Sequence, residues 1–107
     1  MNEEILKKCV AEILGTFIFL GVIITLVNNP SSNLRSLKIG LSLMIAIVFF
    51  GSVSGGHFNP AVSFMLYMND KINETDLIFY IISQLIGALL AYFVFVTIIE
   101  NDKKKIN

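Results

Sequence analysis

A short polar segment inside a long charge-free stretch holds the residues best suited to act on a small molecule. Gly55 and Gly56 are adjacent, and His57 and Asn59 follow closely. Adjacent glycines unwind a helix readily, and unsatisfied polar groups in an apolar environment are costly. The pair Asn59-Pro60 has a further meaning, because Asn is a preferred helix N-cap and Pro a preferred first helical residue. The pattern predicts a helix that begins at Pro60.

The predicted helix is short and ends at a polar cluster. It covers about residues 60–68 before Asn69, Asp70 and Lys71 halt it. At 1.5 Å per residue its length is roughly 14 Å, about half the thickness of a bilayer's hydrocarbon core. The free N–H groups at its start carry roughly half a positive charge, which repels cations. The Asn59 amide can donate to an oxygen, so water or a hydroxyl compound is the expected guest.

The elements that position this segment follow from composition and from the placement of charge. Hydrophobic residues make up 55% of the chain and charged residues 15%, and three charge-free stretches separate the charged clusters. Each stretch exceeds the roughly 20 residues that a membrane-spanning helix needs. Irregular backbone at membrane depth is tolerated only when it is buried in protein or lines a water-filled cavity. We therefore expect an all-α membrane protein of one domain, residues 1–107, with spans at about 9–27, 37–53 and 77–99 and a re-entrant loop and half-helix at about 54–68.

The net charge and the kinds of residue present exclude several classes of function. The net charge is zero, so no basic footprint for nucleic acid is present. Cys9 is the single cysteine, and no His or Cys cluster accompanies it for a metal. No nucleophile and base are paired in the sequence, so we expect neither an enzyme nor a cofactor. The expected partner is the lipid bilayer, and the aromatic residues are predicted to form lipid-facing and packing surface: Phe49, Phe50, Phe79, Tyr80, Tyr92, Phe93 and Phe95.

Three motifs together resemble one known family. The segment Ser-Gly-Gly-His-Phe-Asn-Pro-Ala-Val-Ser at 54–63 resembles the first signature loop of the aquaporin, or major intrinsic protein, family, with its Asn-Pro-Ala box at 59–61. Ala-Glu-Ile-Leu-Gly-Thr at 11–16 is similar to the family's first-helix motif, and Gln-Leu-Ile-Gly-Ala at 84–88 to its third-helix motif. Their order and separation match as well. The resemblance covers essentially the whole chain but only the first half of a normal family member.

The resemblance implies a role for each residue of the signature loop. Asn59, Pro60 and Ala61 would form the central donor site of a pore for water and small neutral solutes such as glycerol. His57, which follows Gly55 and Gly56, resembles the family histidine whose neighbouring carbonyls line the pore. The residues alone favour a satisfied structural histidine over a ligand at this position.

Roles outside the loop follow from the same resemblance. Glu12 and Gln84 would brace the loop through its backbone groups, and Ile39 would occupy the first constriction position, where many water-selective members carry an aromatic side chain. The residues by themselves leave alternatives open. Glu12 lies close to Lys7 and Lys8 and could be interfacial, although a carboxylate within a span is a functional candidate by default. Gln84 could hold helices together.

The complete fold of the family is an inverted repeat of two three-helix halves. One half alone leaves the cavity-facing side of its half-helix open to lipid, so a partner that covers this side is expected. The expected partner is a second copy of opposite topology, in a homo-oligomer, or a separate chain that supplies the complementary half. In the family's orientation three basic residues lie inside and five outside, contrary to the positive-inside bias, which favours opposed copies. Those inside are Lys7, Lys8 and Lys71, and those outside are Arg35, Lys38, Lys103, Lys104 and Lys105. The alternative is a non-conducting, truncated member that acts as an interaction or assembly subunit. The identity of the membrane is not encoded in either terminus.

Overall fold

The computed structural model describes residues 1–102 and consists of helices only over that range. The helices are α1 Glu3–Val27, α2 Arg35–Ser54, α3 Pro60–Met68, α4 Glu74–Tyr92 and the π-helix η1 Phe93–Glu100, which continues α4. Three helical segments are long and apolar enough to cross a membrane: α1, α2 and the continuous segment Glu74–Glu100. The predicted fold class is confirmed, and the chain is an integral, multi-pass membrane protein. The three lysines at 103–105, counted above among the basic residues on the outer side, are not among the described residues.

α1 and α4 begin before the expected membrane spans, because capping rather than apolar length sets where each of them starts. α1 begins at Glu3 instead of near residue 9: the Asn2 side chain accepts a hydrogen bond from the Ile5 N–H at 2.9 Å. A Glu3–Lys7 ion pair at 3.3 Å spans the first turn. Asn73 caps α4 in the same way through the Asp76 N–H at 2.8 Å. These polar turns extend the helices past the apolar stretches.

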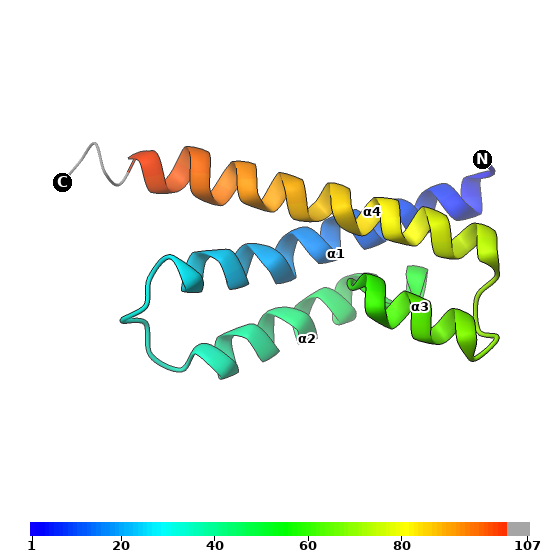
Figure 1. Ribbon diagram of the computed structural model, residues 1–107, viewed down its shortest axis with the longest axis horizontal. Coiled ribbons are helices and arrows are strands. Elements are labelled where there is room, and N and C mark those ends of the chain that lie inside the picture. Colours follow the sequence, from blue (N-terminus) through cyan, green and yellow to red (C-terminus); the bar gives the residue numbers. More distant parts are fainter. Residues whose placement is uncertain (103–107) are drawn as a thin grey trace.

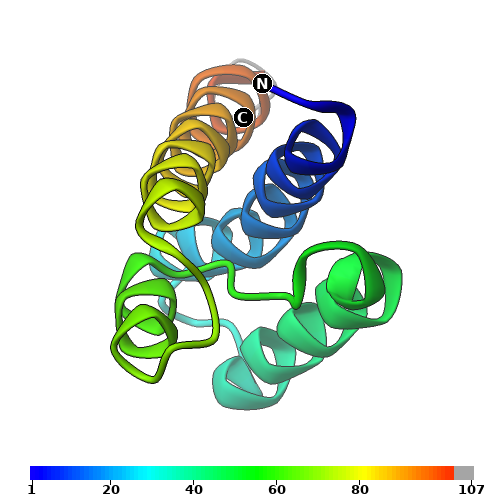
Figure 2. The same ribbon diagram turned by 90° about the vertical axis from the view of Figure 1, so that its right-hand side faces the viewer.

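α1 is the central helix of the bundle. It packs against α2 on one side and against α4 on the other, and α3 packs against α4 (Figure 2). α1 and α4 approach closely at Gly87, where a Cβ atom would lie 2.6 Å from the Ile13 carbonyl oxygen. A side chain larger than hydrogen at this position would push the two helices apart.

The short helix occupies one half of the molecule. α3 begins near the middle of the long axis and runs to the end where the chain's N-terminus and the start of α4 lie (Figure 1). The chain therefore leaves α2, folds back to mid-length, and returns as α3 to the same end. This arrangement is compatible with a re-entrant element, and it places the start of α3 halfway along the long helices.

Candidate functional site

The start of α3 is built by local chemistry, as the Asn59-Pro60 pair predicts. Asn59 has extended backbone, its Oδ1 accepts from the Ala61 N–H at 2.8 Å, and Pro60 is the first helical residue. Asn59 and Ala61 are exposed. Because Oδ1 is turned toward the helix backbone, the Nδ2 group of the same amide is turned away from it. Two N–H hydrogens of Asn59 are thus presented at the tip of the half-helix.

The loop before α3 reverses the chain through residues with left-handed backbone. Gly55 has φ +88° and ends α2, its N–H donating to the Gly51 carbonyl at 2.8 Å. Gly56 follows with φ +68°. Glycine adopts this region without the penalty that a Cβ atom imposes. The two adjacent glycines therefore form the fold-back itself.

Phe58 also has a left-handed backbone, at φ +54°, although it is not glycine. Such a conformation costs on the order of 1–3 kcal/mol and persists only when its surroundings enforce it. Here the Phe58 N–H donates to Glu12 Oε1 at 2.8 Å, and its ring is fully buried against Gly15 of α1. Any Cβ atom at Gly15 would overlap that ring. One polar and one apolar contact from α1 thus hold the residue before Asn59.

Glu12 is completely buried at the centre of this region. Its two oxygens accept four hydrogen bonds, from Ser54 Oγ at 2.7 Å, His57 N at 3.1 Å, Phe58 N at 2.8 Å and Gln84 Nε2 at 2.9 Å. Within residues 1–102 the ion pairs are Glu3–Lys7 and Glu4–Lys8, at the protein surface. Hydrogen bonds from uncharged donors therefore compensate the burial of this carboxylate.

Further side chains extend the network to every helix of the site. Gln84 Nε2 donates a second hydrogen bond to Ser63 Oγ at 2.8 Å, and His57 Nδ1 lies 2.8 Å from the same oxygen. The Tyr80 hydroxyl donates to the Ser54 carbonyl at 2.6 Å. We call the six residues concerned the polar core: Glu12, Ser54, His57, Ser63, Tyr80 and Gln84. All six are buried, so the fold-back is fixed from α1, α2, α3 and α4 together.

The residues singled out in the sequence fall into three groups. Glu12, His57 and Gln84 meet in the polar core, where Glu12 bonds the loop's backbone directly, whereas Gln84 bonds the side chains of Glu12 and Ser63. Asn59 to Ala61 lie at the exposed tip of α3. Ile39 lies apart from both, half-buried near the start of α2.

Three members of the polar core were missed in the sequence: Ser54, Ser63 and Tyr80. Tyr80 is one of the aromatic residues predicted for lipid-facing and packing surface; it is 2% exposed and does pack, and its hydroxyl in addition donates to the Ser54 carbonyl. Helical spacing contained the signal, since residues four apart share a face. Tyr80 lies four residues before Gln84, whereas Ser63 carries no such signal, because Asn59, four residues before it, is the exposed N-cap of α3.

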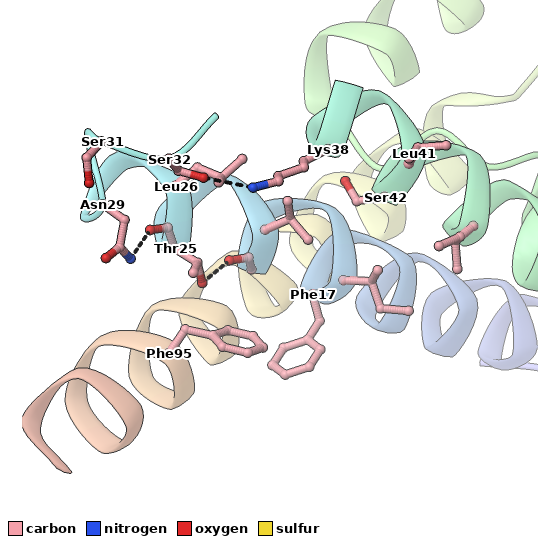
Figure 3. A pocket seen from close by; sticks show the side chains of 14 residues that line it. Phe17, Thr25, Leu26, Asn29, Ser31, Ser32, Lys38, Leu41, Ser42 and Phe95 are labelled. Atoms are coloured by element: carbon pink, nitrogen blue, oxygen red, sulfur yellow. Dashed lines mark hydrogen bonds between the residues drawn. The ribbon is translucent and has the colours of Figure 1, made fainter. Parts of the chain in front are cut away.

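A hollow region lies at the end of the bundle opposite the polar core. It is a cavity of about 780 Å³ between α1, α2 and η1, which we call the groove (Figure 3). Phe17, Ile45 and Phe95 contribute apolar lining, while Asn29, Ser32 and Lys38 lie toward the connection between α1 and α2. Lys38 Nζ donates to Ser32 Oγ at 2.9 Å. Because that connection lies at the end opposite α3, the groove and α3 occupy different halves of the bundle (Figure 1).

Known proteins resemble this chain over most of its length. The family model described as "Major intrinsic protein" matches residues 1–106. The chain is 41% identical over 88 residues to glycerol uptake facilitator protein-like 6 of Lactiplantibacillus plantarum, covering 80% of this chain and 41% of the relative. It is 39% identical over 92 residues to aquaporin-8 of Rattus norvegicus, covering 82% of this chain and 35% of the relative.

A third relative aligns with almost the whole chain. The glycerol uptake facilitator protein of Buchnera aphidicola subsp. Schizaphis graminum is 34% identical over 117 residues, which cover 99% of this chain and 45% of that protein. The chain thus spans less than half the length of these relatives. The names of the relatives agree with the expectation of a channel rather than an enzyme. Taken with the fold-back, the Asn-Pro-Ala box and the Glu12 network, the matches show that the chain belongs to the major intrinsic protein family.

Proposed function

We propose that this chain forms one half of a channel for the passive passage of water and small neutral solutes such as glycerol. The observation that carries the proposal is the orientation of the Asn59 amide. Its Oδ1 is engaged by the Ala61 N–H, so its Nδ2 hydrogens are free to bind the oxygen of a passing molecule. Relatives named aquaporin and glycerol uptake facilitator support the same class of solute.

The electrostatics of α3 favour neutral solutes over cations. A helix N-terminus carries roughly half a positive charge, and here it lies at mid-length of the spanning helices. In pores of this type, opposed half-helix dipoles form a barrier to protons and cations. The half-helix of this chain supplies only one of these two opposed dipoles. The proposal therefore requires a second half-helix that approaches from the opposite side.

The groove is the place where a complementary half would meet this chain. α3 lies in one half of the bundle, where it packs against α4. The groove lies in the other half, between α1, α2 and η1. A second half of opposite orientation would bring its own short helix to that end. A second copy of this chain and a separate chain both meet the requirement. The contrary distribution of basic residues supports the second copy.

Osmotic swelling of proteoliposomes tests the proposal. We expect vesicles that contain the chain to swell faster than empty ones, and Asn59→Ala to remove most of that difference. Asn69→Ala is the matched control, because Asn69 is an exposed cap at the other end of the same helix and should conduct as the wild type does. Permeability equal to that of empty vesicles for the correctly inserted chain would favour the non-conducting assembly role instead.

Tags at the two termini test the identity of the partner. Two populations of opposite orientation in the same membrane would support pairing of opposed copies. One orientation in every molecule would eliminate that homodimer and leave a separate chain as the source of the second half.

A further inference from the structure

The single histidine of the chain lies in the polar core with one ring nitrogen bonded. His57 is 6% exposed, its Nδ1 lies 2.8 Å from Ser63 Oγ, and its ring packs against Tyr80 with centroids 4.6 Å apart. A neutral imidazole carries its hydrogen on one of its two nitrogens, and the bond made by one nitrogen decides which. The distance alone is compatible with either direction of donation. The surrounding network decides the direction.

The direction follows from the Glu12 carboxylate. A carboxylate accepts and does not donate, so the Gln84 atom 2.9 Å from Glu12 Oε1 must be the amide nitrogen. An amide oxygen at that place would repel the carboxylate. With Nε2 so placed, its second hydrogen is directed at Ser63 Oγ, 2.8 Å away. The orientation of the Gln84 amide is thus set, and both of its hydrogens are used.

The Ser63 hydroxyl has one hydrogen to donate once it accepts from Gln84. Ser63 is fully buried, and within residues 1–102 the acceptor at bonding distance from its oxygen is His57 Nδ1. Donation in the reverse direction, from Nδ1 to Ser63, would leave the hydroxyl hydrogen buried without an acceptor. A buried donor without a partner costs about 1–3 kcal/mol, which is enough to decide between two tautomers.

We infer that Ser63 is a positioning residue that fixes His57 as the neutral tautomer with its hydrogen on Nε2. The hydrogen bonds run in one direction, from the Gln84 amide to the Ser63 hydroxyl and from that hydroxyl to His57 Nδ1. The loop therefore presents a donor, rather than an acceptor, on the side of the ring that faces Gly55, where a Cβ atom would lie 3.5 Å from Nε2. The inference concerns the folded loop and holds whether or not the chain conducts.

Nitrogen-15 NMR of histidine-labelled protein in lipid bilayers tests the inference directly. The chain contains one histidine, so the spectrum reports His57 alone. In the wild type at neutral pH we expect Nδ1 to resonate as a nitrogen without hydrogen and Nε2 as a nitrogen that carries one. A wild-type spectrum with the hydrogen on Nδ1, or with the two tautomers averaged, would overturn the inference even if every variant misfolds.

Variants of Ser63 separate the tautomer effect from simple packing. Ser63→Ala should move the Nδ1 resonance toward the averaged position, because the donor to Nδ1 is lost, whereas Ser63→Thr should restore the wild-type pattern. Ser83→Ala is the matched control: Ser83 is also buried, but its hydroxyl bonds the Phe79 carbonyl of its own helix at 2.7 Å. An unchanged tautomer in folded Ser63→Ala, or an equal change in Ser83→Ala, would contradict the role of Ser63.

Discussion

The two ends of the bundle differ in what lies between the helices. At the end where α3 lies, the polar core and the Phe58 ring fasten the loop before α3 to the long helices, and Glu12 alone accepts four hydrogen bonds. At the other end the groove between α1, α2 and η1 remains open, with a volume of about 780 Å³. Both ends are built on α1. The difference teaches that buried hydrogen bonds fix the fold-back before α3 at one end, whereas a mainly apolar groove stays open at the other.

Substitutions in the buried polar core should also lower the free energy of unfolding more than substitutions beside the open groove. Each buried donor or acceptor depends on its partner, whereas the apolar side chains that line the groove have no hydrogen bond to lose. Cys9, buried on α1 one turn before Glu12, is a suitable probe of unfolding, because burial shields its thiol from reagents in the folded bundle. Thiol labelling in detergent along a denaturant series therefore measures the free energy of unfolding for the variants below.

Glu12→Gln should cause the largest loss of stability. The amide's NH₂ group would face two donors that the carboxylate oxygen accepts, and unsatisfied donors cost about 1–3 kcal/mol each. We expect a loss of about 2–6 kcal/mol. Glu4→Gln is the control on the same helix, because Glu4 is exposed, and it should change stability by less than about 0.5 kcal/mol. Equal thiol reactivity of the two variants would show that the Glu12 network contributes nothing to stability.

Two buried serines of α2 compare the two ends directly. Ser54→Ala removes a 2.7 Å hydrogen bond to Glu12 and should cost about 1–3 kcal/mol. Ser42→Ala removes only a bond to the Ile39 carbonyl of its own helix, beside the groove, and should cost less than about 1 kcal/mol. The same labelling assay measures both. A larger cost at Ser42 would reverse the order of the two ends.

Gly15→Ala should destabilise the protein, whereas the same substitution at Gly40 should not. The new methyl group would overlap the buried Phe58 ring, and overpacking costs about 1–3 kcal/mol. Gly40→Ala, on α2, meets no atom within 4 Å and should stabilise its helix by about 0.5–1 kcal/mol. Opposite signs of the two changes in the unfolding free energy are the expected result. Stabilisation by Gly15→Ala would mean that Phe58 is not held in place.

Gly21→Ala places the same methyl group beside the groove and should have the smallest effect. It meets the ring of Phe95, which is half-buried and lies at the open end, so the ring can turn into the groove. The gain in helix propensity offsets part of that movement, and we expect a net change within about 1 kcal/mol. A cost as large as that of Gly15→Ala would show that the groove end is packed as tightly as the polar core.

The sequence by itself determined the elements that depend on neighbouring residues. Apolar length predicts the three spans, Asn59-Pro60 predicts the start of α3, and Gly55-Gly56 predicts the fold-back, because capping and backbone freedom act over a few residues. The family motifs at 11–16, 54–63 and 84–88 already indicated that Glu12 and Gln84 act on the loop.

Only the tertiary structure decided which distant side chains contact one another. Glu12 lies 42 residues from Ser54 and 72 from Gln84, and no periodicity predicts contacts across such separations. Ser63 looks like an ordinary helical residue until α3 and α4 pack together, and the groove is lined jointly by α1, α2 and η1. Adjacent side chains determine local geometry, whereas a buried hydrogen-bond network requires the whole bundle to bring its donors and acceptors within hydrogen-bonding distance of one another.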